Sequence, residues 1–121
     1  MVINLSVLVV ASAFMGMGLV ALVRPATIMT LVDSQAATVT ARNEVRAVYG
    51  GFGVCLALLL AMIESVGPGL SPGVYLAVGV ALAGMALGRI ISATIERPGV
   101  LPWLFTLIES AAALVLFSQL S

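Results

Sequence analysis

Four long apolar runs constrain the fold of this chain more than any other feature. They cover about residues 2–23, 42–64, 73–95 and 101–120, and a transmembrane helix needs roughly 20 apolar residues. Hydrophobic residues make up 62% of the 121 residues and charged residues 8%, against about 45–50% and about 25% in ordinary soluble domains. So few polar groups cannot cover so much apolar surface in water, whereas lipid can. We therefore predict an all-α, membrane-spanning four-helix bundle that forms a single domain over residues 1–121.

The connection between the first two runs has a different composition. Arg24-Pro25 ends the first run, because proline does not continue a helix easily. Residues 26–40 start apolar and become polar at Asp33-Ser34-Gln35, so they are too short and too mixed to span. We predict a short segment there, partly helical, at the membrane interface. A secretory signal peptide is the alternative for the first run, but no basic residue precedes it, as a signal would require.

The composition also argues against several classes of function. The chain has five arginines, five acidic residues, no lysine and no histidine. It therefore has no basic tract for nucleic acid, and it lacks the commonest metal ligand. The single cysteine, Cys55, cannot form an internal disulfide or a thiolate cluster. We predict no metal site, no cofactor and no nucleic-acid partner.

The arginines also predict an orientation. Arg24, Arg42 and Arg97 lie in or beside the first and third connections, whereas the second connection and both termini contain none. Because arginine is enriched on the cytoplasmic side, we expect those two connections to be cytoplasmic. The termini of this multi-pass protein would then face the periplasm or the exterior.

Three charged residues lie well inside the apolar runs: Arg46, Arg89 and Glu109. A charge at the bilayer centre costs roughly 2.5–3.5 kcal/mol on insertion scales, so such residues usually have partners. Arg89 precedes Gly99 by ten residues and Glu109 follows it by ten. In an antiparallel helical hairpin, equal distances from the turn give equal depths. We therefore predict a buried ion pair between Arg89 and Glu109.

The second run contributes further candidates. Arg42, Arg46 and Tyr49 have i, i+4, i+7 spacing and so share one helical face. Gly50 and Gly53 adjoin this face and should let a neighbouring helix approach. We expect Arg46 and Tyr49 to extend the Arg89–Glu109 pair into a network. Glu44 lies on a different face, where it would meet Arg97 at the surface. Small residues also recur at Ser12/Gly16 and Gly84/Gly88, which favours close packing between helices.

Two interpretations of this polar cluster remain open. It can be purely architectural, because a satisfied pair fixes helix register. Alternatively, it lines a cavity open to the cytoplasmic side, where surplus arginine would bind a lipid headgroup or a small molecule. On the second interpretation the ligand-binding residues are Arg46, Tyr49, Arg89, Glu109 and Glu44. Tyr49 and Glu109 are conceivable acid–base groups, but their spacing specifies no reaction.

A family resemblance rests on three parts of the chain. The run Asn43-Glu44-Val45-Arg46-Ala47-Val48-Tyr49-Gly50-Gly51, then Leu87-Gly88-Arg89, and then Glu109 resemble a bacterial family of small four-helix membrane proteins of unknown function. That family is similar to the DoxX-like proteins. The resemblance implies the four-helix topology and the inner membrane, and it implies no activity. Small multidrug exporters match in length, but their essential glutamate lies in the first helix. The first apolar run of this chain, residues 2–23, contains no ionisable residue.

Three functions follow as hypotheses. The first is a small membrane protein that binds a lipid headgroup or a small lipophilic ligand at the polar cluster. The second is an accessory subunit of a larger membrane complex, and homo-oligomers are also conceivable. The third, and least supported, is a DoxX-like membrane enzyme. The lack of histidine and of any cofactor motif argues against enzymatic activity.

Overall fold

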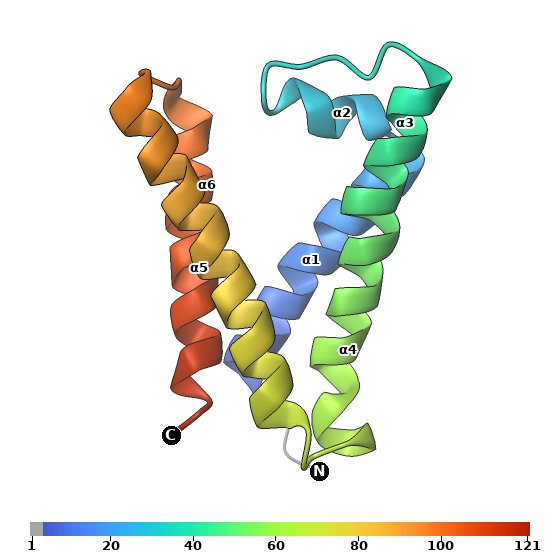
Figure 1. The fold of residues 1–121 in the computed structure, drawn as a ribbon. Coiled ribbons are helices and arrows are strands. Elements are labelled where there is room, and N and C mark those ends of the chain that lie inside the picture. Colours follow the sequence, from blue (N-terminus) through green and yellow to red (C-terminus); the bar gives the residue numbers. More distant parts are fainter. Residues whose placement is uncertain (1–3) are drawn as a thin grey trace. The chain divides into compact units, whose positions relative to one another are not determined.

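Within residues 4–121, which the computed structural model describes, every regular element is a helix (Figure 1). The prediction of an all-α chain is therefore confirmed. The elements are α1 (Leu5–Val23), α2 (Pro25–Thr30), α3 (Val39–Val45), the π-helix η1 (Arg46–Gly51), α4 (Phe52–Val66), α5 (Ser71–Ile95) and α6 (Val100–Ser118).

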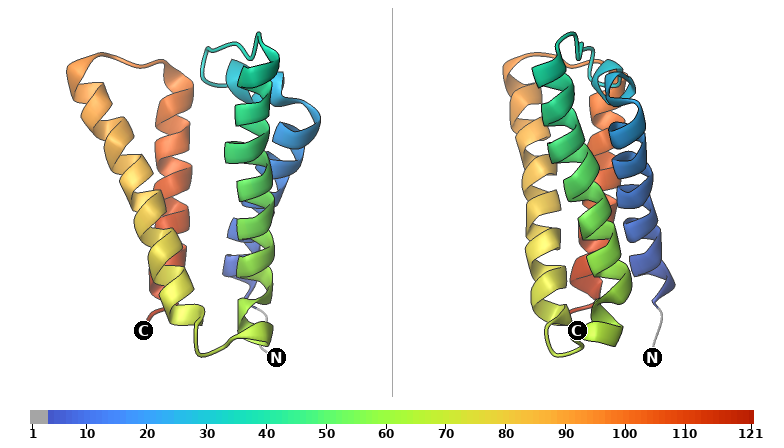
Figure 2. Two further views of the ribbon diagram at one scale, coloured as in Figure 1. Left: turned by 45° about the vertical axis from the view of Figure 1, so that its right-hand side comes forward. Right: turned by 90° about the vertical axis from the view of Figure 1, so that its right-hand side faces the viewer.

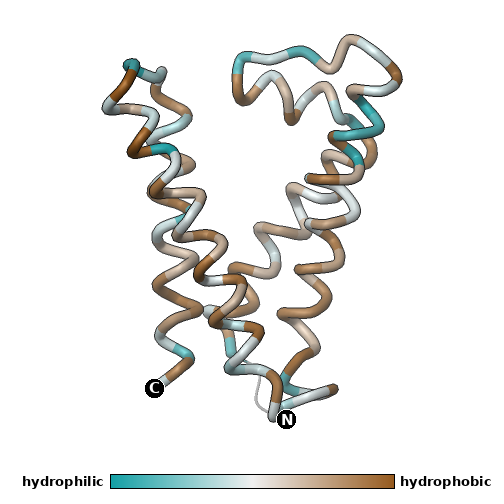
Figure 3. Tube along the Cα trace, in the orientation of Figure 1, coloured by the Kyte–Doolittle hydropathy of each residue, from teal (hydrophilic) through white to brown (hydrophobic). Residues whose placement is uncertain are grey.

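Four helical spans are long and apolar enough to cross a membrane: Leu5–Val23, Val39–Val66, Ser71–Ile95 and Val100–Ser118. The shortest has 19 residues, or about 28 Å at 1.5 Å per residue, which matches a hydrocarbon core about 30 Å thick. Polar residues gather at the helix ends and connections, while the helix bodies are mostly apolar (Figure 3). The four predicted spans are confirmed, with shifted ends. Residues 2 and 3 of the first predicted span lie outside the described residues.

The helix ends follow from local sequence. Asn4 caps α1, because its side-chain oxygen accepts hydrogen bonds from the backbone N–H groups of Ser6 and Val7. Pro25 stops α1 and occupies the first turn of α2, where its missing N–H costs nothing. The predicted short helix between the first two spans is thus present, although its position at the membrane surface stays a prediction.

The second span differs most from its prediction. It begins at Val39, three residues before the predicted start, because Thr38 caps α3 by accepting a hydrogen bond from the Ala41 N–H. It is also not a uniform α-helix, since residues 46–51 form a π-helix. A π-helix has more residues per turn than an α-helix. The α-helical spacing expected from Arg46 to Tyr49 therefore does not hold.

The chain divides into two compact units, residues 4–63 and 64–121. In unit 1, α1 packs antiparallel against η1 and the start of α4, with α2 and α3 at one end (Figure 2). Ala21, Ile28 and Val45 form a small buried cluster there. The single domain predicted for residues 1–121 stays a prediction.

Unit 2 is an antiparallel hairpin of α5 and α6. Its buried residues recur every three or four positions, as they must on one face of each helix. They are Ser71, Tyr75, Val78, Gly79, Leu82 and Ala86 in α5, and Thr106, Glu109, Ala113 and Leu116 in α6.

Candidate ligand site beside Arg89

The predicted ion pair between α5 and α6 is present. Arg89 donates from Nε to Glu109 Oε1 at 2.7 Å and from Nη2 to Oε2 at 2.9 Å. This two-bond geometry is the strongest that arginine and a carboxylate form. The side chain of Glu109 is 10% exposed and that of Arg89 is 29% exposed, so the arginine extends to the surface of the hairpin. Equal distance from Gly99 was sufficient to predict this contact.

Neighbouring α6 residues hold the arginine in place. The Arg89 guanidinium lies over the Phe105 ring, 5.3 Å from its centroid, where the electron-rich face attracts a cation. Phe105 and Glu109 are one helical turn apart, so they contact the guanidinium from the same side of α6. The buried hydroxyl of Thr106 donates to the Pro102 carbonyl at 2.8 Å and is therefore satisfied within its own helix.

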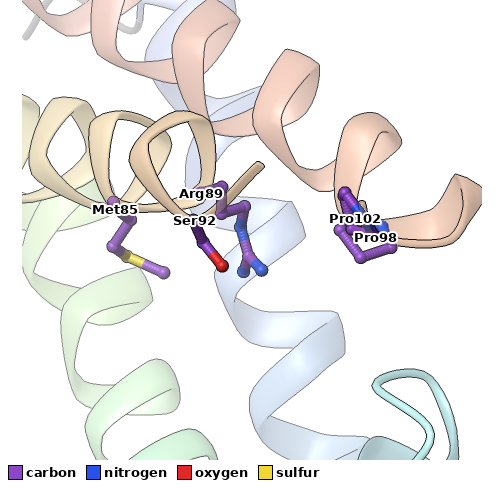
Figure 4. Close-up of a pocket in the computed structure, with 6 residues that line it drawn as sticks. Met85, Arg89, Ser92, Pro98 and Pro102 are labelled. Carbon is purple, nitrogen blue, oxygen red and sulfur yellow. The ribbon is translucent and has the colours of Figure 1, made fainter. Parts of the chain in front are cut away.

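A pocket of about 420 Å³ lies beside the ion pair. Met85, Gly88, Arg89 and Ser92 of α5 line it, with Pro98 of the connection and Pro102 of α6. Arg89 and Ser92 lie next to each other on α5, and the two prolines lie across from them (Figure 4). The wall thus combines apolar surface with hydrogen-bond donors, as ligand sites usually do.

Most of this lining was not predicted from the sequence. Gly88 was expected to allow close packing with a neighbouring helix. A Cβ atom at Gly84 or Gly88 would meet nothing within 4 Å, so within unit 2 neither glycine makes a close contact with α6. Gly88 instead leaves space that belongs to the pocket. The signal that could have found the site was a glycine next to an arginine in an apolar run, followed by the two prolines Pro98 and Pro102.

Arg46 and Tyr49 have contacts within unit 1. Arg46 donates from Nε to the Leu22 carbonyl at 3.0 Å, which satisfies a carbonyl near the carboxyl end of α1. Tyr49 packs against the cluster of Ala21, Ile28 and Val45. Glu44 is exposed on α3. The network that would join these residues to Arg89 and Glu109 stays a prediction, as does the pair between Glu44 and Arg97.

Close packing in unit 1 depends on three glycines. A Cβ at Gly50 would lie 2.8 Å from Leu22 Cδ2, and one at Gly53 would lie 3.2 Å from the Phe14 carbonyl oxygen. The predicted approach of a neighbour to Gly50 and Gly53 is confirmed. In α1, however, Gly16 faces open space, and the contact is made by Gly18, whose Cβ would lie 2.8 Å from the Val54 nitrogen. Within unit 1, the close contact of α1 is therefore at Gly18 and not at Gly16.

A second buried polar contact lies in unit 2, near the start of α5. The Tyr75 hydroxyl donates to Glu64 Oε1 at 3.1 Å, and Tyr75 is 4% exposed. The sequence analysis did not predict this contact. Among residues 4–121, no three His, Cys, Asp or Glu side chains come close enough to hold a metal ion.

Together, four helices that can span a membrane and a partly buried ion pair define a small multi-pass membrane protein. The model of one family, described as a domain of unknown function (DUF4345), matches residues 2–120, so the chain belongs to that family. No curated protein and no solved structure matches it.

Proposed function

We propose that the protein binds a small lipophilic molecule in the pocket between α5 and α6, with the polar end of the molecule at Arg89 and Ser92. The observation that carries this proposal is an arginine, fixed by two hydrogen bonds to Glu109, in the wall of a pocket of about 420 Å³. Pockets that hold small molecules are roughly 300–1,000 Å³ and mostly apolar, with a few placed polar groups.

The charge balance of the site favours a particular class of ligand. In unit 2 the charge of Arg89 is matched by that of Glu109, so an anionic ligand would compete with the carboxylate. A neutral hydrogen-bond acceptor, such as a carbonyl or hydroxyl oxygen, would not. Met85 and the two prolines supply apolar contacts for the rest of the molecule.

Gly88→Leu and Gly84→Leu test the proposal as a matched pair. Both glycines lie on α5, and both have open space where a Cβ would stand, but only Gly88 lines the pocket. Native mass spectrometry of each variant, purified in a mild detergent, should show retained small molecules in wild type and Gly84→Leu. Gly88→Leu should retain at least tenfold less. Equal retention in the two variants would overturn the proposal.

We also propose that the protein lies in the bacterial inner membrane with both termini in the periplasm, and that it is related to the DoxX-like proteins. Arg24, Arg42 and Arg97, at the first and third connections, support this orientation. The Glu44–Gly51 run carries the proposed relationship. Alkaline phosphatase fused after Ser121 should be active in a bacterial host; an inactive but stable fusion would reverse the orientation.

A further inference from the structure

Three arginines gather at one end of unit 1. Arg24 lies between α1 and α2, Arg42 lies in α3, and Arg46 begins η1. The hydrogen bond from Arg46 to the Leu22 carbonyl brings the end of α1 next to the start of the second span. The views in Figures 1 and 2 agree that α2 and α3 lie at this same end of the unit.

Neutral partners fix two of these side chains. Arg42 donates from Nη1 to the Ala36 carbonyl at 3.0 Å, and Arg46 donates from Nε to the Leu22 carbonyl at 3.0 Å. A carbonyl orients a guanidinium without cancelling its charge, in contrast to the carboxylate that holds Arg89. Side chains that are already ordered lose less entropy when they bind a ligand.

The acidic residues at this end of unit 1 do not balance the arginines. Glu44 is exposed on α3. Asp33 follows α2 with a φ of 56°, and the N–H of Ser34 donates to the Met29 carbonyl, an arrangement that closes a helix end. Three arginines against Asp33 and Glu44 leave a net charge of +1 (3 − 2).

This charge lies where two spanning segments end. Leu5–Val23 finishes just before Arg24, and Val39–Val66 begins just before Arg42. Exposed apolar side chains flank the arginines, and these are Leu22, Val23, Leu31, Val32 and Val48. A ligand that matches both the positive charge and the exposed apolar side chains carries an anionic group next to hydrocarbon chains.

We propose that this end of unit 1 is a binding site for an anionic phospholipid, whose phosphate is held by Arg24, Arg42 and Arg46 while its acyl chains lie along the flanking apolar residues. Arginine binds phosphate through several N–H groups of fixed geometry. The site uses residues of unit 1 alone and is therefore independent of the pocket beside Arg89.

Native mass spectrometry of the full chain, with equal amounts of phosphatidylglycerol and phosphatidylcholine added in detergent, tests the site. Wild type should retain phosphatidylglycerol preferentially. Arg24→Gln should lower that retention about fivefold, the contribution of one arginine near anionic lipid. Arg24 is exposed, and its backbone N–H rather than its side chain meets α1 at the Val20 carbonyl, so this variant should still fold.

Two further variants sharpen the test. Glu44→Gln removes a negative charge and should raise phosphatidylglycerol retention. Arg97→Gln removes an exposed arginine from the connection of unit 2 and should leave retention unchanged. Equal retention of the two lipids by wild type would overturn the proposal. An equal loss in Arg24→Gln and Arg97→Gln would also overturn it, because general charge would then explain the binding.

Discussion

The two units use buried or anchored arginine in different ways. In unit 1, Arg42 and Arg46 donate to backbone carbonyls and keep their full charge. In unit 2, Arg89 donates to Glu109, and the pair is electrically balanced. The difference teaches that a guanidinium held by a carbonyl remains a strong attractor for anions, whereas one held by a carboxylate mainly fixes structure and offers polarity to neutral groups.

The units also differ in what brings their helices together. In unit 1, backbone approaches backbone at Gly18 and Gly53. In unit 2, a Cβ at the buried Gly79 would meet the Phe117 ring at 2.6 Å, a contact with a side chain rather than with backbone. Unit 1 therefore brings backbone against backbone at two glycines, whereas unit 2 combines an ion pair with a glycine that makes room for an aromatic side chain.

The largest expected effect concerns the ion pair of unit 2. Arg89→Ala leaves the buried carboxylate of Glu109 without its partner, so we expect a loss of about 3 kcal/mol in the free energy of unfolding. Glu109→Ala should cost less, because Arg89 is the more exposed partner. The double variant should be more stable than Arg89→Ala. Unfolding by sodium dodecyl sulfate in mixed micelles measures all three; additive losses would show that the pair contributes no coupling.

A smaller effect is expected in unit 1 from Gly18→Ala. The added Cβ would lie 2.8 Å from the backbone nitrogen of Val54, which cannot move without shifting the helix, so we expect a loss of about 2 kcal/mol. Gly16→Ala is the matched control on the same helix. It meets open space and should gain roughly 0.5 kcal/mol from helix propensity. Similar unfolding curves for the two variants would refute close packing at Gly18.

The smallest expected effect comes from Arg46→Gln. Removing its hydrogen bond to Leu22 strands no buried charge, so the free energy of unfolding should fall by about 1 kcal/mol. The comparison between the units requires this loss to be smaller than that of Arg89→Ala in the same micelle assay. If Arg46→Gln lowered the free energy of unfolding more than Arg89→Ala does, the contrast between the two arginines would be refuted.

The sequence alone was enough for the broad architecture and for one contact. The four apolar runs predicted the four spans because a helix must be about 20 apolar residues long to cross a bilayer. The equal distances of Arg89 and Glu109 from Gly99 predicted the ion pair, because a hairpin sets depth by counting residues from its turn. The glycines at 50 and 53 predicted a close neighbour, though not which residue of α1 it would meet.

Tertiary structure decided the rest. The π-helix at residues 46–51 changes the direction of Tyr49, and α-helical periodicity contains no sign of it. The hydrogen bond from Arg46 to the Leu22 carbonyl could not be predicted either, because every residue has a backbone carbonyl and the sequence does not indicate which one is the acceptor. The pocket beside Arg89 is lined by Gly88 of α5 together with Pro98 and Pro102. The shape of such a pocket depends on how two helices pack against each other, whereas the length of a span and the depth of a residue within it follow from the local sequence.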